Sequence, residues 1–231
     1  MIFQLTGRDY ATIILNGGAI ILIFGVLRTF LFTNVKDRLD DVLFIRLMIL
    51  NILLALANTV SYVIDYKEIN GAWLIKMIST TLFYLVLMLT GLCWRHYTSV
   101  RFAYDLRKNW RRNLIITVAA LLSLIILINP FTGWFFSLDS DMDLHRGLLY
   151  VPVYIIIVIY VFAGFFDIVR YRTNRGTKGP VPVWFYMLPV ICGGLLTLFV
   201  PGSPSFAPIG IAISIAFTHA GTVTEVTDIL S

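Results

Sequence analysis

The chain has 231 residues, of which 58% are apolar and only 13% are charged, and its mean hydropathy is +0.85. A soluble domain carries roughly 25% charged residues, so this chain has too little polar surface to coat a soluble globule of its size. Its net charge of +5 follows from the basic loops described below, and nucleic-acid binding is not needed to explain it. The composition therefore indicates a polytopic membrane protein.

Apolar runs, bounded by charged residues or by glycine and proline, fill nearly the whole chain. A helix needs about 20 apolar residues to cross a hydrocarbon core about 30 Å thick, and its backbone groups must be paired within the segment. Continuous runs such as 155–166 do not alternate as barrel strands would. We therefore expect an all-α fold, a seven-transmembrane helix bundle. The predicted spans are 11–32, 42–64, 73–94, 113–128, 148–169, 181–200 and 206–220.

Lysine and arginine follow the first, third and fifth predicted spans. Cytoplasmic loops keep an excess of these residues, whereas the alternate loops hold Lys67, Arg146 or no basic residue. This pattern predicts that the N-terminus lies outside and the C-terminus in the cytoplasm, with the chain in the cell inner (plasma) membrane. The basic residues on the predicted inner side are Lys36, Arg38, Arg95, Arg101, Arg107, Lys108, Arg111, Arg112, Arg170, Arg172, Arg175 and Lys178.

Polar residues recur along single faces of the second and third spans. Asn51, Asn58, Tyr62 and Asp65 share one face of the second span, because they are separated by seven, four and three positions. The third span carries Lys76, Thr80, Phe83, Thr90 and Trp94. Such side chains turn toward the bundle interior, where they either join helices by hydrogen bonds or bind a ligand. For Lys76 the alternatives are ligand contact, together with Asp65, or an ammonium that extends to the lipid headgroups.

The stretch 129–147 between the fourth and fifth spans is the most unusual in the chain. Its aromatic residues Trp134, Phe135 and Phe136 are expected either to cover the outer mouth of the bundle as a lid or to form an interfacial aromatic belt. The aspartates that follow resemble the start of a calcium loop. The glycine and the distal glutamate of that loop are missing, however, and no calcium site is expected.

Other signals for chemistry are weak. Arg46 and Asp167 each lie about one turn inside a span, where they either pair with each other or extend to the headgroups. His96 and His219 lack acidic or cysteine companions, so we predict no metal site and no cofactor. Cys93 and Cys192 are given no role. We find no nucleophile elbow, zinc-binding helix or phosphate-binding glycine loop, and we predict no catalytic residues.

The last predicted segment is amphipathic. Val223, Val226 and Leu230 recur at helical spacing with polar residues between them. We therefore divide the chain into a membrane domain, residues 1–221, and the start of a cytoplasmic linker helix, residues 222–231. Such a helix is expected either to pair with its own copy or to lead into a cytoplasmic domain beyond this chain. A free tail is the alternative.

One group of residues resembles a known family. Asn129-Pro130, the aromatic stretch, Phe136-Ser-Leu-Asp139 and His145-Arg146-Gly147 before a tyrosine-rich span resemble the seven-helix sensor region of bacterial signalling proteins. That region precedes diguanylate cyclase or histidine kinase domains. Leu144 departs from the pattern, in which an aromatic residue often precedes His-Arg-Gly. The resemblance implies a receptor-like input domain, a homodimer and a cytoplasmic output domain.

We therefore expect a non-enzymatic sensory domain that binds a small extracellular or membrane-derived ligand in an outer pocket between the second, third, fifth and sixth spans. A small permease or transporter is the alternative from another functional class. The predicted ligand-binding residues are Tyr62, Asp65, Lys76, Thr80, Phe83, Trp134, Phe135, Phe136, Asp139, Arg146, Tyr150, Tyr154, Trp184 and Tyr186.

Overall fold

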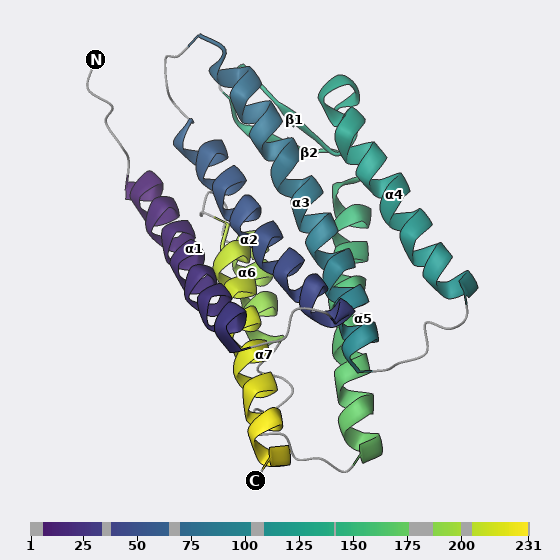
Figure 1. The fold of residues 1–231 in the computed structure, drawn as a ribbon. Coiled ribbons are helices and arrows are strands. Elements are labelled where there is room, and N and C mark those ends of the chain that lie inside the picture. Colours follow the sequence, from purple (N-terminus) through teal and green to yellow (C-terminus); the bar gives the residue numbers. More distant parts are fainter. Residues whose placement is uncertain are drawn as a thin grey trace.

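The computed structural model describes residues 7–33, 38–64, 70–102, 109–140, 142–175, 187–199 and 205–230. These residues form an antiparallel helical bundle with a short β-hairpin at one end (Figure 1). The helices are α1 (Gly7–Thr33), α2 (Leu39–Val63), α3 (Ala72–Arg101), α4 (Asn109–Thr132), α5 (Tyr150–Arg175), α6 (Leu188–Phe199) and α7 (Ala207–Leu230). The strands are β1 (Phe136–Leu138) and β2 (Leu144–Arg146), which pair with Ser137 opposite His145.

The helical architecture predicted from the apolar runs is confirmed, and it is that of an α-helical membrane protein. Within the part of the chain that the structure describes, five helices are long and apolar enough to cross a membrane, and a shorter apolar helix covers Ala207–Gly221. Seven crossings and their orientation stay a prediction. The five candidate spans are Asp9–Phe32, Leu39–Val63, Ala72–Arg101, Asn113–Thr132 and Tyr150–Tyr171.

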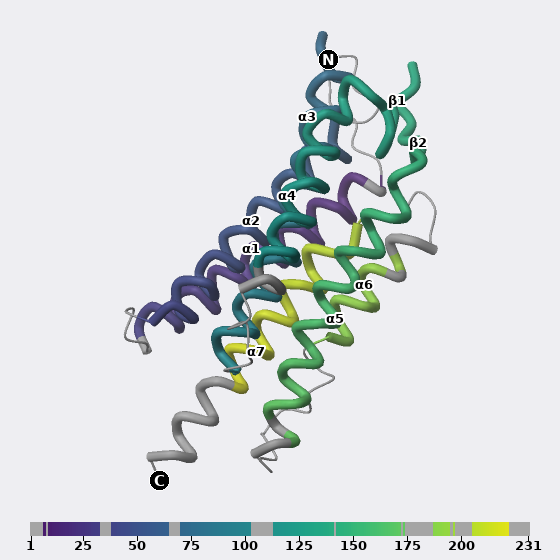
Figure 2. Tube along the Cα trace, turned by 90° about the vertical axis from the view of Figure 1, so that its right-hand side faces the viewer, coloured from purple at the N-terminus to yellow at the C-terminus, as the bar shows by residue number. Residues whose placement is uncertain are grey.

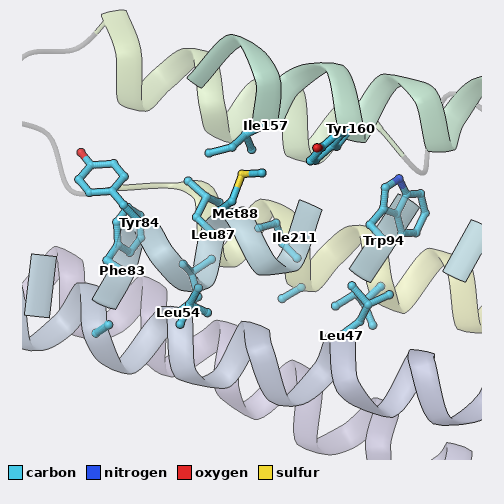
Figure 3. Close-up of a cluster of buried hydrophobic side chains, with 14 of the residues drawn as sticks. Leu47, Leu54, Phe83, Tyr84, Leu87, Met88, Trp94, Ile157, Tyr160 and Ile211 are labelled. Carbon is cyan, nitrogen blue, oxygen red and sulfur yellow. The ribbon is translucent and has the colours of Figure 1, made fainter. Parts of the chain in front are cut away.

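Helix α3 is the centre of the bundle. It packs against α2, α4 and α5, whereas α1 lies between α2 and α7, and α6 packs on α7. Figure 2 shows α1 and α2 along one side of the molecule and α5 and α6 along the other. In Figure 3, Leu87 and Met88 of α3 fill the space between α2 and α5, opposite Ile157. Apolar side chains on several faces of α3 therefore make one continuous core.

Polar residues in α3 are satisfied within the protein. The hydroxyls of Thr81 and Thr90 donate to the carbonyls of Met77 and Val86, each at 2.8 Å. Hydroxyl groups near a carbonyl of the preceding turn are paired in this way without a partner on another helix. These threonines therefore fit the interior of a bundle that offers no water to their side chains.

Buried ion pairs join the helices at their arginine-rich ends. Asp167 of α5 is paired with Arg95 of α3 and accepts a hydrogen bond from the Ser99 hydroxyl at 3.2 Å. Asp40 of α2 is paired with Arg101 of α3 at 2.8 Å. A buried carboxylate requires such a partner, because an uncompensated charge is strongly destabilising. The suggested pairing of Asp167 with Arg46 is therefore wrong, since Arg95 holds this position.

The closest approach of α3 and α5 depends on a glycine. A Cβ atom at Gly164 would lie 2.4 Å from Trp94 Nε1 and 3.1 Å from Thr98 Oγ1. The indole cannot move away easily, because its Nε1 donates to the Val161 carbonyl at 3.3 Å. Gly164 therefore sets the distance between these two helices where Trp94 crosses α5.

Gly164→Ala is expected to lower the free energy of unfolding by about 1–3 kcal/mol, because the added methyl overpacks the α3–α5 contact. Gly25→Ala is the matched control, since nothing lies within 4 Å of a Cβ at that position. The control should be neutral or slightly stabilising, because alanine favours helix more than glycine does. Denaturant or thermal unfolding in detergent measures both. Equal stability of the two variants would contradict this account of the contact.

Candidate functional site

The asparagines of α2 form a polar cluster with α1 and the start of α7. Asn58 Nδ2 donates to Asn16 Oδ1 and to the Ser205 carbonyl, each at 3.3 Å. Asn51 Nδ2 donates to the Pro208 carbonyl at 3.2 Å, and its Oδ1 atom is buried without a hydrogen-bond partner among the described residues. The cluster therefore joins α1, α2 and the start of α7.

The β-hairpin is held by Asn129, the last polar residue of α4 before its internal proline. Asn129 Oδ1 accepts from the amides of Phe135 at 2.7 Å and Phe136 at 3.1 Å, and its Nδ2 donates to the Phe136 carbonyl at 2.8 Å. Asn129 is 1% exposed, so water does not compete for these bonds. The side chain substitutes for a β-strand partner and fixes the chain as it leaves α4.

The tip of the hairpin is organised by Asp139. Its carboxylate accepts from the Asp143 amide at 2.8 Å and pairs with His145 Nε2 at 2.9 Å. Met142 has a φ of 64°, and its carbonyl accepts a hydrogen bond from Lys76 Nζ of α3. Lys76 is 6% exposed and thus anchors the hairpin to the N-terminal end of α3. Among the described residues no group of three or more metal ligands is present.

Gly147 allows the hairpin to fold back on itself. A Cβ at this position would lie 2.3 Å from the Trp134 carbonyl oxygen, and the Gly147 amide donates to the Phe135 carbonyl at 2.9 Å. Four of the positions on which the family resemblance rests thus lie in one folded unit. Asn129, Asp139 and Gly147 make its backbone contacts, and Arg146 lies over the ring of Tyr150, 5.1 Å from its centroid.

An aromatic cluster lies beneath the hairpin. Tyr84 of α3 contacts Phe135 with ring centroids 4.9 Å apart, and Phe135 stacks on Tyr150 of α5 at 5.3 Å. Phe135 and Phe136 are fully buried, whereas Trp134 is 54% exposed. The two phenylalanines are therefore core residues between α3 and α5, and Trp134 lies at the surface.

Tyr84 is absent from the residues expected from sequence. A signal for it was present, because positions 76, 80 and 84 are four residues apart and share a helix face. Thr80 on that face hydrogen-bonds Ser61 of α2 at 2.8 Å, and the Phe83 ring packs on Tyr84 at 5.1 Å. Thr80 and Phe83 therefore lie between α2 and the aromatic cluster. Asp65, Trp184 and Tyr186 lie outside the described residues, so the proposed approach of Asp65 to Lys76 stays a prediction.

A cavity of about 290 Å³ lies deeper in the bundle, between α3, α5, α6 and α7. Tyr154 stacks on Tyr150 at 5.8 Å and lines this cavity, so it connects the aromatic cluster to the space below. Trp94, Thr90 and Ser214 also line it, and the other lining residues are glycine or apolar side chains. Thr90, Ser214 and Tyr154 carry the hydroxyl groups of the lining, and no charged side chain is among the lining residues. The cavity therefore suits a small, largely apolar molecule.

No protein-family model, curated protein or solved structure matches this chain. The resemblance drawn from the 129–147 stretch therefore stays an expectation. What the chain does is best argued from the cavity and the helices around it.

Asn129→Ala is expected to open the β-hairpin locally, because it leaves three buried backbone groups without a partner. The loss should be about 3 kcal/mol, which corresponds to about 100-fold faster hydrogen exchange of the Phe135 and Phe136 amides. Asn113→Ala is the control, since Asn113 is an exposed residue of the same helix. Unchanged exchange at both amides in the Asn129 variant would show that the hairpin is held by other contacts.

Proposed function

We propose that this chain is a receptor-like membrane sensory domain that binds a small apolar ligand between α3, α5, α6 and α7. It crosses the bilayer seven times, with the N-terminus outside and the C-terminus in the cytoplasm. The ligand changes the position of α7, which transmits the signal. The observation that carries the proposal is that α7 lines the cavity with Ile211, Ser214 and Ile215 and continues as one helix to Leu230.

The ligand enters from the bilayer in this proposal. Val158 and Phe162 of α5 line the cavity and are 40% and 38% exposed, so they extend from the cavity to the outer surface of the bundle. A lipophilic molecule concentrates in the membrane before it reaches such an opening. Apolar contact with the lining then stabilises it by roughly 25 cal/mol per Å² of buried apolar surface.

Signalling requires that the ligand binds one arrangement of the helices better than another. Helix α5 packs mainly on α3, whereas α6 packs on α7. A molecule between these two pairs fixes the distance from α5 to α7. Through the resemblance, the output is a cytoplasmic diguanylate cyclase or histidine kinase domain, and the signalling unit is a homodimer.

Gly194→Leu tests the site, because Gly194 lines the cavity and nothing lies within 4 Å of a Cβ there. The leucine should fill the cavity without disturbing the backbone. In a fusion of the chain to a diguanylate cyclase reporter after Leu230, this variant should lose at least tenfold in sensitivity to an active lipophilic compound. Gly25→Leu is the control, because its side chain also enters open space but away from the cavity.

Three outcomes would count against the receptor proposal. They are a cyclase reporter that responds to no compound in a lipophilic library, equal responses of the Gly194 and Gly25 variants, and ligand-dependent solute uptake by vesicles that contain this chain alone. The third outcome would favour the permease alternative. Reporter activity and uptake are measured on the same purified preparations, so poor folding is recognised by its effect on both.

Insertion of one alanine after Gly221 tests the route through α7. One residue rotates the following helix by about 100°, whereas four residues rotate it by little more than one full turn. The single insertion should change the basal output of the reporter or abolish its response to ligand. Insertion of four alanines should restore much of it. A reporter that tolerates both insertions equally would exclude transmission by helix rotation.

A further inference from the structure

A second cavity lies on the opposite side of α3, between α2, α3 and α4. Its volume is about 420 Å³. Ile49 of α2 and Ile116 of α4 line it and are 48% and 50% exposed, so it opens as a groove on the outer surface of the bundle. Most of its lining is aliphatic, and Leu50, Leu89 and Leu92 are typical of it. The groove therefore faces lipid along its length.

Basic side chains distinguish this groove from the first cavity. Arg46, Arg95 and His96 line it, and all three lie toward the arginine-rich ends of α2 and α3. Arg95 is already paired with Asp167. Among the described residues, no ion pair or hydrogen bond includes the Arg46 guanidinium. Arg46 is therefore an available cation within a mainly apolar groove.

The position of Arg46 makes this charge informative. It lies about one turn inside the predicted span 42–64 of α2, which corresponds to about 6 Å along the helix axis. A charged side chain at such a depth is costly, and it pairs with an anion or extends to the headgroup region. In the headgroup region the anion that a guanidinium meets is a lipid phosphate. Arginine binds phosphate by two parallel hydrogen bonds, which adds geometric selectivity to the charge.

We propose that the groove binds one anionic phospholipid. Its phosphate accepts hydrogen bonds from Arg46, with His96 beside it, and an acyl chain lies along Leu50, Leu89 and Ile116. The aliphatic lining and the opening toward the bilayer favour a lipid over a free anion, which would leave most of the groove empty. The site is separate from the ligand cavity and does not depend on the receptor proposal.

Binding is measured on the full chain in phosphatidylcholine nanodiscs titrated with phosphatidylglycerol, with the bound lipids counted by native mass spectrometry. We expect Arg46→Gln to weaken phosphatidylglycerol binding about tenfold or more. Arg28→Gln is the matched control, because Arg28 is an exposed arginine of α1 at the same end of the bundle as Arg46 and does not line the groove. It removes the same charge and should leave the affinity within about twofold of the unsubstituted protein.

A second variant separates shape from charge. Leu89→Trp fills part of the groove without changing any charge, and it should also weaken phosphatidylglycerol binding. If Arg46→Gln does not fold, Arg46→Lys keeps the charge without the planar fork and should bind with intermediate affinity. Equal losses in the Arg46 and Arg28 variants would overturn the proposal in favour of diffuse surface attraction. Full binding by Leu89→Trp, or complete displacement of the lipid by glycerol 3-phosphate at similar concentration, would also overturn it.

Discussion

Hydrocarbon offers no hydrogen bonds, and this constraint accounts for the pairing of most buried polar groups in the bundle. Helix α3 shows the consequence most fully, because it is polar at both ends and central to the packing. At one end Lys76 donates to the Met142 carbonyl and ties the hairpin to the helix. At the other end Arg95 is paired with Asp167 and ties α5 to it. Between these points Thr81 and Thr90 donate to carbonyls of their own helix, and Thr80 bonds to Ser61 of α2. These two attachments hold the hairpin and α5 against α3.

Helix α5 packs closely against α3 at Gly164, but a cavity separates it from α6 and α7. Toward α3, Gly164 allows Trp94 to approach within contact distance, and the Trp94 indole bonds to the Val161 carbonyl. Interlocked contacts of this kind leave no room for a second arrangement. The cavity lies next to this contact, since Trp94 and Val161 line it together with residues of α6 and α7. A bundle with one rigid contact and one open side can change the separation of α5 from α7 without losing its core, which is the property that a ligand-dependent switch needs.

Sequence reasoning located the helices well, because hydrophobic runs report the environment directly. It failed where partners had to be chosen across helices. The apolar run ends at Trp94 and therefore predicts that Arg95 lies in a loop. Helix α3 instead continues to Arg101, so Arg95 lies inside the helix. There Arg95, and not Arg46, pairs with Asp167. The strands β1 and β2 were missed for a related reason: Asn129, rather than a strand pattern, holds them. The division into a membrane domain and a linker helix near Gly221 rests on a change of composition and stays a prediction, and α7 runs through this boundary without a break. Apolar length thus predicts where the helices lie in the chain, whereas helix ends and polar pairings depend on tertiary contacts.

The same distinction applies to the two cavities. Neither is visible in the sequence, because each is lined by residues from three or more helices. They differ in chemistry, since arginines line the groove, whereas no charged residue lines the cavity between α3, α5, α6 and α7. They nevertheless meet at one contact. Arg95 lines the groove while its guanidinium pairs with Asp167 on α5, and α5 also lines the cavity. The Arg95–Asp167 ion pair therefore connects a residue that lines the groove to a helix that lines the cavity.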